Sequence, residues 1–329
     1  MNYESILKEF KEKRVLVVGD VMLDAYILGK VTRVSPEAPV PVVALDKKEN
    51  RIGGAGNVAL NLKNLGAFPI IASVVGTDSE GQILEGLFKK RGISSEGLVK
   101  SDLRKTTVKT RVISSKQQLL RVDSEDTHPL STDHEKVLFE RILNLIEIGL
   151  DAIILEDYDK GVLNENNIQR IIKEAAKRNI PVTADPKKAN FHSYNGLSLF
   201  KPNLKELKEG LNLDFDFESN LFAFEASVNE LRKVLPHEIS LITLSEHGVY
   251  ICNDSQKHHI PAHKREITDV SGAGDTVIAV ATLCYLAGAP ISTIAEIANI
   301  AGGMVCEKPG VVSISFEKLK NEVRELLQQ

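Results

Sequence analysis

Short apolar runs recur along the chain, and segments with helical periodicity separate them. Residues 14–19 (RVLVVG), 152–155 and 241–244 are runs of strand length in which Val, Ile and Leu dominate, a pattern typical of strands buried on both faces of a sheet. Residues 135–148 and 167–177 show the apolar spacing of helices. Alternation of this kind predicts an α/β fold built on a parallel sheet flanked by helices.

Two further segments interrupt this pattern with β-type alternation. Residues 25–52 are rich in Val and Pro and alternate between apolar and polar positions at 40–45, as expected for a sheet with one wet face. Residues 106–123 alternate around a central turn and predict a hairpin. Since no linker, repeat or low-complexity tract separates these segments from the rest, we expect one domain over residues 1–329. Segments 25–52 and 106–123 would form a small β lid over its site.

Polar residues follow several of the buried runs. In parallel sheets, ligands bind outside the carboxyl ends of the strands. Asp20, Asp24, Glu156 and Ser245 stand just beyond such runs, so we expect them near a binding site.

The longest apolar run, residues 276–287, predicts a helix that is buried on all sides. Gly272 and Gly274 precede it in the sequence SGAGD, and the free N–H groups of such a helix start favour an anion. Asp275 could take a proton from a hydroxyl while those N–H groups stabilise a transferred phosphoryl group. The pattern therefore suggests phosphoryl transfer. The alternative is that the glycines allow tight packing and Asp275 complements the helix dipole.

Composition limits the partners and the compartment. The chain has 329 residues, 43% of them apolar, with a net charge of -4 and no run of Lys and Arg, so we expect neither nucleic acid nor membrane as a partner. Cys252, Cys284 and Cys306 lack CxxC spacing and are expected to stay unpaired in a reducing compartment. Residues 1–13 predict a charged amphipathic helix without the apolar core of a signal peptide, and no apolar run is long enough to span a membrane. We therefore expect a cytoplasmic protein.

The string DVSGAGDT at residues 269–276 resembles the signature of the ribokinase-like (PfkB) carbohydrate kinases. The resemblance implies a ribokinase-like fold and ATP with Mg²⁺ as the phosphoryl donor. It also implies Asp275 as the catalytic base and Gly272, Ala273 and Gly274 as the anion hole. No G-x-x-x-x-G-K-[ST] sequence occurs, so the chain is not a P-loop kinase.

Longer stretches resemble the kinase domain of the bifunctional heptose kinase/adenylyltransferases. They are VVGDVMLDAYILGKVTRVSPEAPVPVV, GGAGNVALNLKNLGA, KTRVISSKQQLLRVD, LEDYDKGVL, ADPKK and KPNLKEL. This resemblance implies transfer of the ATP γ-phosphoryl group to the anomeric hydroxyl of D-glycero-β-D-manno-heptose 7-phosphate, giving the 1,7-bisphosphate for ADP-heptose synthesis. The nucleotidyltransferase domain of those relatives carries an H-x-G-H sequence that the 329 residues lack, so we expect the kinase domain alone.

The broader kinase pattern implies a set of residues that bind the sugar hydroxyls. These are Asp24, Gly53, Gly54, Asn57 and Glu156. Carboxylate and amide groups suit this task because a carboxylate accepts two hydroxyl bonds and an amide both donates and accepts. Taken alone, Asp24 would be better explained as a turn or cap residue.

The resemblance also implies a nucleotide site. Asn203 and Glu206 lie three apart at an expected helix start and so share a face. In the family, such a pair orders Mg²⁺, its waters and the nucleotide phosphates, a task for hard oxygen ligands. The alternative is a helix cap with a solvated Glu. Further nucleotide contacts implied by the resemblance are Thr243, Ser245 and Gly248, with Asn299 beside the adenine.

Basic residues are candidates for phosphate contacts. Lys109 and Arg111 are two apart on an expected strand and so point to one face, and guanidinium groups such as those of Arg111 and Arg121 bind phosphate in a bidentate fork. We expect these lid residues to hold the phosphate of the sugar, with Lys160 and Lys187 as further candidates. The alternatives are an edge strand whose charges oppose aggregation and, for each isolated Lys, a solvated surface position.

A monovalent cation and a second copy of the chain are expected as partners beside the substrates. By resemblance, Asp269 and Ser271 are a candidate site for a monovalent cation beside the anion hole. The alternating lid strands leave an apolar face that a lone flap would expose, so we expect a homodimer in which two lids pair.

Other functions stay open beside the heptose kinase. One is a kinase of the same fold that acts on another sugar or sugar phosphate, and another is a non-catalytic sugar or nucleotide sensor. The loop from Gly54 also fits the G-x-G-x-x-A of a dinucleotide fold, with Asp78 about twenty residues on. Against that hypothesis, residues 46–52 (DKKENRI) do not look like the buried strand that it requires.

Overall fold

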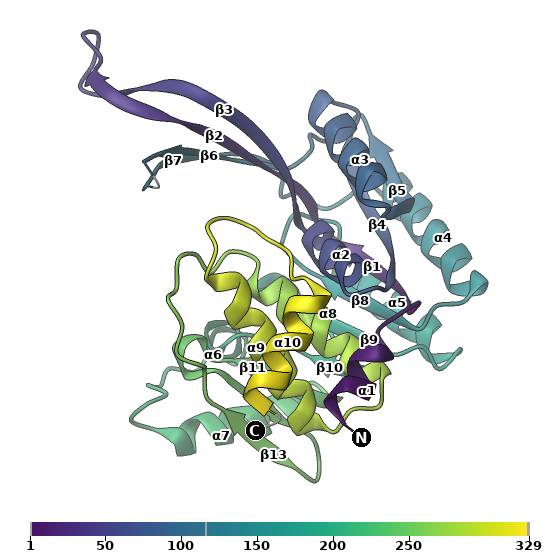
Figure 1. The fold of residues 1–329 in the computed structure, drawn as a ribbon. Coiled ribbons are helices and arrows are strands. Elements are labelled where there is room, and N and C mark those ends of the chain that lie inside the picture. Colours follow the sequence, from purple (N-terminus) through teal and green to yellow (C-terminus); the bar gives the residue numbers. More distant parts are fainter. Residues whose placement is uncertain (1, 116, 328–329) are drawn as a thin grey trace.

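A central sheet of mostly parallel strands organises the chain (Figure 1). The structure is a computed structural model and describes residues 2–115 and 117–327. Among these residues the main sheet has nine strands, in the order β13-β12-β11-β10-β9-β8-β1-β4-β5, antiparallel at β12 and β13 and parallel elsewhere. The strands are β1 (Arg14–Gly19), β4 (Phe68–Gly76), β5 (Ser94–Ser101), β8 (Ala152–Glu156), β9 (Val182–Asp185), β10 (Leu197–Phe200), β11 (His237–Thr243), β12 (Val249–Cys252) and β13 (Lys257–Ile260).

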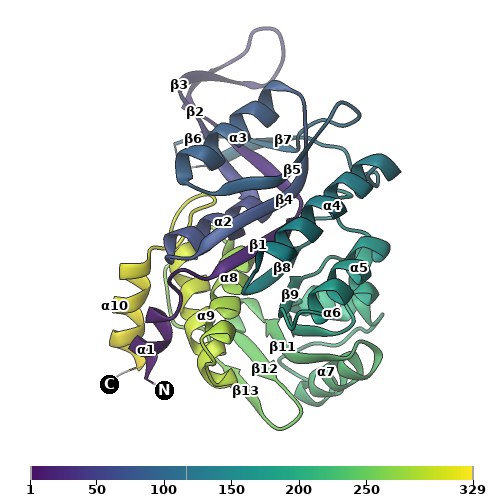
Figure 2. The same ribbon diagram turned by 90° about the vertical axis from the view of Figure 1, so that its right-hand side faces the viewer.

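Helices cover both faces of this sheet (Figure 2). Val15 and Val17 of β1 pack into one apolar core with α1, α2, α3, α8, α9 and α10, whereas Leu16 and Val18 pack into a second core with α4 to α7. This division explains why the run at β1 is apolar at successive positions. The helices are α1 (Tyr3–Lys8), α2 (Ala55–Asn64), α3 (Ser79–Arg91), α4 (Thr132–Ile148), α5 (Glu165–Ala176), α6 (Leu204–Gly210), α7 (Leu221–Val234), α8 (Ala273–Leu286), α9 (Ile291–Cys306) and α10 (Phe316–Leu327), with 3-10 turns η1 (Lys188–Ser193) and η2 (Ser245–His247).

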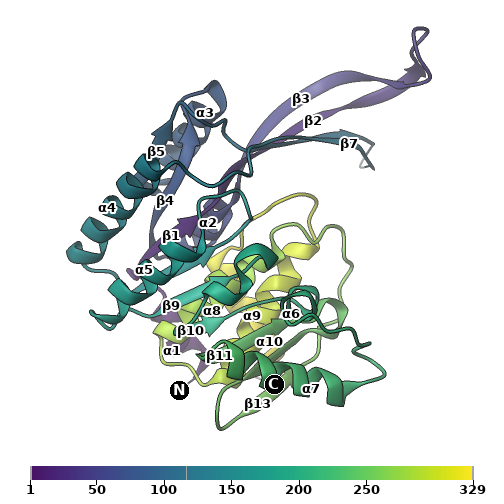
Figure 3. The ribbon, with the colours of Figure 1, turned by 180° about the vertical axis from the view of Figure 1, so that it is seen from behind.

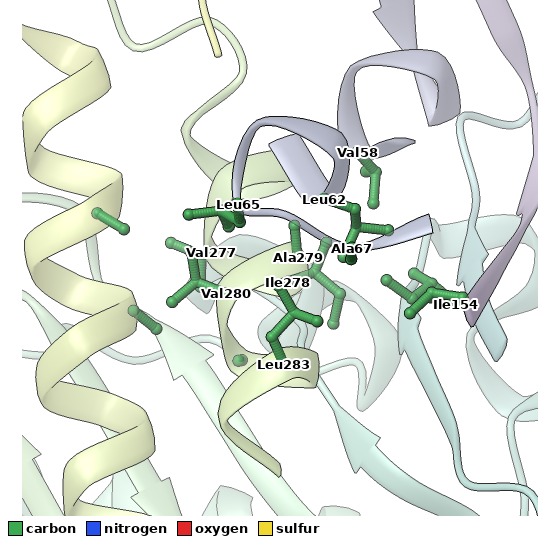
Figure 4. Packing of buried hydrophobic residues seen from close by; sticks show 14 of the residues in the cluster. Val58, Leu62, Leu65, Ala67, Ile154, Val277, Ile278, Ala279, Val280 and Leu283 are labelled. Carbon is green, nitrogen blue, oxygen red and sulfur yellow. The ribbon is translucent and has the colours of Figure 1, made fainter. Parts of the chain in front are cut away.

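Helix α8 lies inside the first core. Every residue from Asp275 to Cys284 is buried, so the predicted helix with apolar surroundings on all sides is confirmed. Figure 4 shows Val277 and Val280 of α8 among side chains of the first core that include Leu62 of α2. Since this packing fixes α8 against the sheet, it also fixes the position of Asp275 at its first turn.

The two segments expected to form a lid pair with each other in a second sheet. Among the described residues this sheet has four strands in the order β3-β2-β6-β7, and it extends away from the main sheet, above the part of the body that carries α6 and α9 (Figures 1 and 3). Strand β2 pairs antiparallel with β3 and parallel with β6. Strands β2 (Val21–Val34) and β3 (Pro41–Gly54) extend well beyond the alternation at 40–45. Strands β6 (Val108–Ser114) and β7 (Gln117–Ser124) lie close to the bounds of the expected hairpin at 106–123. Lys116, in the expected hairpin turn, lies outside the described residues.

Other expectations from the sequence can be compared with the structure. Cys252, Cys284 and Cys306 are buried, and none forms a disulfide within the described residues. The N-terminal helix is shorter than residues 1–13, because α1 ends at Lys8, and Met1 lies outside the described residues. Nowhere in residues 2–115 and 117–327 is a helix long and apolar enough to cross a membrane.

Candidate active site

Asp275 stands at the first turn of α8 with both carboxylate oxygens engaged. Its side chain is buried, with 4% of its surface exposed. The hydroxyl of Tyr158 donates to Oδ1 over 2.6 Å, and Nδ2 of Asn57 donates to Oδ2 over 2.7 Å. The carboxylate is therefore held in one orientation by residues from the loop after β8 and from α2.

Burial raises the pKa of Asp275 above its usual range, and the nearby charge of Asp185 adds to that effect. The hydrogen bonds from Tyr158 and Asn57, and the ammonium of Lys201, act in the opposite direction. Lys201 forms a buried ion pair with Asp185 over 2.8 Å. A carboxylate with a raised pKa in a site of fixed polar groups is suited to accept a proton.

The start of α8 offers N–H groups to an anion. Among the described residues, the N–H groups of Gly274 and Asp275 have no hydrogen-bond partner, whereas that of Ala273 donates to the carbonyl of Val270 over 3.2 Å. Gly272 has a φ of 82°, a left-handed conformation that glycine adopts without strain. A side chain at Gly274 would place its Cβ 3.3 Å from Oδ2 of Asp185. Of the three residues expected in the anion hole, Ala273 therefore contributes an N–H that is already used.

The expected sugar-binding residues are all buried, and Asn57 among them contacts Asp275 directly. Asp24 is buried in β2, and a Cβ at Gly53 would lie 2.1 Å from its Oδ2, so position 53 requires glycine. Gly54 precedes α2 with a φ of 58°. Glu156 ends β8 and is buried; its Oε2 has no hydrogen-bond partner among the described residues. Burial, followed by the charges of Asp185 and Asp275, raises the pKa of Glu156 well above its usual range.

The lid cations differ in what they contact. As expected, Lys109 and Arg111 share one face of β6, and Lys109 lies over the ring of Tyr158 in the loop after β8. Arg111 is buried and forms an ion pair with Asp24, and Lys160 pairs with Glu125 over 2.8 Å. Arg121 is half exposed and pairs with Asp123 over 2.9 Å. Lys109 forms no ion pair within the described residues; its Nζ lies 5.7 Å from the ring centroid of Tyr158.

Asn203 and Glu206 form a reciprocal cap at the start of α6. Oδ1 of Asn203 accepts the N–H of Glu206 over 2.8 Å, and Oε2 of Glu206 accepts the N–H of Asn203 over 2.9 Å. The alternative of a helix cap is therefore what the structure shows, but Glu206 is buried instead of solvated. Its Oε1 accepts a hydrogen bond from Lys187, so Lys187 is not an isolated surface lysine.

The other residues expected at the nucleotide lie along the adjoining edge of the sheet. Thr243 ends β11 and forms a bridge with Asn203, and Ser245 lines a pocket of about 710 Å³ together with Asn203 and Lys188. Gly248 approaches the carbonyl of Ile260, because a Cβ there would lie 2.1 Å from it. Asn299 of α9 donates to the carbonyl of Pro261 over 2.9 Å. Residues 260–261 thus connect the loop of Gly248 with Asn299.

Asp269 holds a loop that also contacts the lid. Its Oδ1 accepts the N–H of Ser271 over 2.9 Å and its Oδ2 the N–H of Gly310 over 2.9 Å. Burial alone would raise the pKa of Asp269, but these hydrogen bonds outweigh it and lower the pKa. On the lid, the hydroxyl of Tyr26 accepts the N–H of Val311 over 3.1 Å, and Nη1 of Arg51 donates to its carbonyl over 3.1 Å. The loop around Gly310 therefore joins the lid to the segment that precedes the anion hole.

We expect Gly310→Ala to destabilise the protein more than Gly288→Ala. Both glycines have left-handed backbones, with φ of 71° and 67°, which costs a non-glycine residue about 1–2 kcal/mol. A Cβ at Gly310 would lie 2.8 Å from the hydroxyl of Tyr26 and 3.0 Å from Nη1 of Arg51, whereas one at Gly288 meets no atom of the described residues within 4 Å. Crowding should add about 1–3 kcal/mol at Gly310 alone. Urea unfolding of both variants measures this difference in the free energy of unfolding. Equal destabilisation of the two variants would show that the loop around Gly310 moves to accommodate the added Cβ without cost.

Several residues of this site were not identified from the sequence. Tyr158, Asp185 and Lys201 each follow or end a strand at its carboxyl end, so the rule that ligands bind there could have found them. Asp20 was expected at the site, but its role is to hold the loop after β8, because it accepts the N–H groups of Tyr158, Lys160 and Val162. Burial and the charge of Asp157 raise the pKa of Asp20 to about 6.

The structure does not favour the dinucleotide hypothesis. Residues 46–52, which should have formed a buried strand, lie in β3 of the lid, mostly exposed. Asp78 caps α3 by accepting the N–H of Gly81 over 2.8 Å, and it also accepts hydrogen bonds from Thr106. Its carboxylate is thus used within the fold.

The mostly parallel sheet, the β lid and the carboxylate at the start of α8 define the ribokinase-like class of α/β proteins. Within that class, the chain belongs to the pfkB family of carbohydrate kinases, whose family model matches residues 12–318.

Curated relatives match nearly the whole chain but are longer than it. "Bifunctional protein HldE" of Methylobacillus flagellatus is 40% identical over 310 residues, which cover 94% of this chain and 63% of the relative. The protein of that name from Helicobacter pylori strain J99 is 39% identical over 307 residues, covering 93% of this chain and 65% of its own length. The chain thus spans less than two thirds of these relatives.

Solved structures share the fold at low sequence identity. Phosphofructokinase-2 from Escherichia coli in complex with potassium has a TM-score of 0.79 and 17% identity, covering 96% of this chain and 99% of that one. Arabidopsis thaliana ribokinase complexed with ribose and ATP has a TM-score of 0.71 and 16% identity, covering 95% and 99%. These likenesses support the ribokinase-like fold that the sequence predicts.

Proposed function

We propose that this chain is a kinase that transfers the γ-phosphoryl group of ATP to the anomeric hydroxyl of D-glycero-β-D-manno-heptose 7-phosphate, giving the 1,7-bisphosphate and ADP. The observation that carries the kinase activity is the buried carboxylate of Asp275 beside the N–H groups of Gly274 and Asp275 at the start of α8. Membership of the pfkB family and the resemblance of the lid motifs to the heptose kinases support the choice of acceptor. An intact Asp275 argues against a non-catalytic sensor.

In the proposed reaction, the side chains act on the acceptor and the N–H groups on the transferred group. Asp24, Asn57 and Glu156 orient the sugar through its hydroxyls. Asp275 takes the proton of the anomeric hydroxyl as the oxygen forms a bond to the γ-phosphorus and the bond to the leaving ADP breaks. The N–H groups at the start of α8 stabilise the charge on the phosphoryl oxygens. Asp275 then releases its proton to water.

Mg²⁺ fits the oxygen atoms on the nucleotide side of this site. Within the described residues no group of three or more His, Cys, Asp or Glu is placed to hold a metal ion by direct contact. Oδ1 of Asp185 is buried without a hydrogen-bond partner among those residues, and burial, followed by the charge of Asp185, raises the pKa of Glu206. We propose that Asp185, Glu206 and Asn203 hold Mg²⁺ through water. When bound, the ion neutralises charge on the phosphates of ATP.

A monovalent cation is a further candidate, at Asp269 and Ser271. Each oxygen of Asp269 accepts one backbone N–H, which leaves further lone pairs for a cation. The similar phosphofructokinase-2 structure contains potassium. The buried, unpaired thiols suit a reducing compartment, so we place the reaction in the cytoplasm.

Release of ADP over a panel of sugars and their 7-, 6- and 1-phosphates tests this proposal. We expect the highest kcat/KM with heptose 7-phosphate. A higher value with another sugar phosphate would assign the kinase to that substrate. No ADP release with any acceptor would contradict the kinase.

The outward face of the lid supports a homodimer. Arg111 pairs with Asp24 and lies over the ring of Tyr26, whose hydroxyl accepts the N–H of Val311. These three side chains therefore face the body, and residues of the opposite parity point away from it. The register places Leu120 opposite Val112, and Val112 opposite Ile27, on that outward face. Exposed apolar residues on this face are Val31, Leu45, Leu120 and Val122. An apolar face of this kind is typical of an interface, and we propose a second copy of the chain as its partner.

We expect light scattering to show a dimer at micromolar concentration that Leu120→Glu and Val122→Glu convert to monomers, because the charge would be desolvated in the paired lids. Phe222→Glu is the matched control, since Phe222 of α7 is 85% exposed and lies outside the lid. A monomeric wild-type chain would contradict the lid dimer. So would dissociation caused by Phe222→Glu but not by the lid variants.

A further inference from the structure

Tyr158 contacts the proposed base from a loop that is itself held in place. It comes two residues after Glu156, at the carboxyl end of β8. Its N–H donates to Oδ2 of the buried Asp20 over 2.9 Å. Its hydroxyl donates to Oδ1 of Asp275 over 2.6 Å, while Asn57 occupies the other oxygen. The side chain is thus anchored at its backbone and directed at one oxygen of the carboxylate.

Two ammonium groups also lie over the ring of Tyr158. Nζ of Lys109, from the lid, and Nζ of Lys187, from the loop after β9, each lie 5.7 Å from its centroid. Lys109 is on the side expected to receive the acceptor, and Lys187 contacts Glu206 on the side expected to receive the nucleotide. Tyr158 therefore stands where the two substrates would meet, beside the group that removes the proton.

We propose that Tyr158 is a positioning residue that holds the carboxylate of Asp275 in its ionised, oriented form for the acceptor hydroxyl. A hydrogen bond to the charged form of a buried carboxylate favours that form. Because each carboxylate oxygen has more than one acceptor site, the sugar hydroxyl can approach while the phenol stays bound. The phenol keeps its own proton, since burial and the charge of Asp275 raise its pKa well above the usual range. This inference rests on the proposed function.

Several groups face Asp275 and set its charge together with Tyr158. They come from β8, β9 and the residue after β10. Asp185 opposes its ionisation, whereas Lys201 favours it. The charge of Asp275 in turn adds to the burial and the Asp185 charge that raise the pKa of Glu156. Asn57 adds a neutral donor from α2. Tyr158 is the donor among them that can be removed by the loss of one oxygen atom, without any change of net charge.

Tyr158→Phe tests this role, with Tyr285→Phe as the matched control. Tyr285 lies on the same helix as Asp275 and donates to a carboxylate, that of Glu238, over 2.8 Å. We expect Tyr158→Phe to lower kcat about tenfold at neutral pH and to move the acid limb of the pH profile up by about one unit or more. The direction follows because loss of the donor raises the pKa of the base, which must be ionised to act. KM for ATP should stay unchanged, and Tyr285→Phe should match the wild type.

An acid limb that stays in place in Tyr158→Phe would overturn the inference, even if kcat falls, since a purely structural role lowers rate without moving the pH profile.

A second measurement works without any acceptor. Phenolate absorbance compared between Asp275→Asn and Asp275→Asn/Tyr158→Phe gives the titration of Tyr158 without the Asp275 charge. The difference in phenolate absorbance between the wild type and Tyr158→Phe gives the titration of Tyr158 with the Asp275 charge present. We expect Tyr158 to ionise at lower pH without the charge, and equal values would overturn the contact. If the wild type released no ADP with any acceptor, the proposed function would fail while this measurement still decided the contact.

Discussion

Asp275→Asn should lose turnover by about a hundredfold or more, the range of general base catalysis, while both substrates stay bound. The amide keeps the shape of the side chain but does not accept the proton of the sugar hydroxyl. The surroundings can adapt, because Oδ1 of Asn57 has no partner among the described residues and a rotation of that amide would offer an acceptor to the new NH₂ group. Single-turnover kinetics and titration calorimetry with each substrate separate the loss of chemistry from a loss of binding.

Asp133→Asn is the control for the alternative that Asp275 merely complements the helix dipole. Asp133 is an exposed acid in the first turn of α4, so it shares the dipole environment without the site. We expect it to leave turnover unchanged. The stability of Asp275→Asn should not fall either. Since the folded-state pKa of Asp275 is raised, its ionisation weakens folding as pH rises, and a neutral amide removes that penalty. Near-normal turnover in Asp275→Asn would exclude it as the base.

The fold was predictable where a pattern is local. The apolar run at Arg14–Gly19 and the helix after Asp275 depend on neighbouring residues alone, and both form as expected. The extent of β3 was not predictable in the same way. Residues 46–52 are mostly charged and mostly exposed, so their strand is specified by backbone pairing with β2 and not by an alternating apolar face.

The partners within the site were beyond the sequence because they join distant segments. Tyr158 and Asp275 are 117 positions apart, and Asp24 and Arg111 are 87 apart. Each residue type is consistent with a surface position when considered alone. Only the packing of α8 against the sheet and the pairing of β2 with β6 in the lid bring these groups together. The motif residues could thus be named from the sequence. The sequence could not show whether a given Lys or Arg is already paired with a carboxylate.

Lys109→Met should raise KM for the phosphorylated acceptor by about ten- to a hundredfold, the equivalent of a hydrogen bond to a charged group, and change KM for ATP little. Arg111 was expected to hold the substrate phosphate, but its guanidinium is paired with the buried Asp24. Lys109 instead carries an ammonium with no ion pair among the described residues. Burial of Lys109 lowers its pKa, which indicates a charge removed from water and suited to an anionic ligand.

Two variants separate the role of Lys109 from general damage to the lid. Arg111→Ala leaves Asp24 buried without its partner, which costs about 3–5 kcal/mol in typical buried pairs. Because Asp24 is the proposed contact to the sugar hydroxyls, this variant should raise KM for the phosphorylated sugar and KM for the free sugar by the same factor. Arg121→Met removes an exposed cation of the lid and should leave KM for both acceptors unchanged. Steady-state kinetics with both acceptors distinguish the two lid cations. If Arg111→Ala raised KM for the phosphorylated sugar alone, and Lys109→Met raised KM for both sugars equally, the phosphate would be bound by the guanidinium of Arg111.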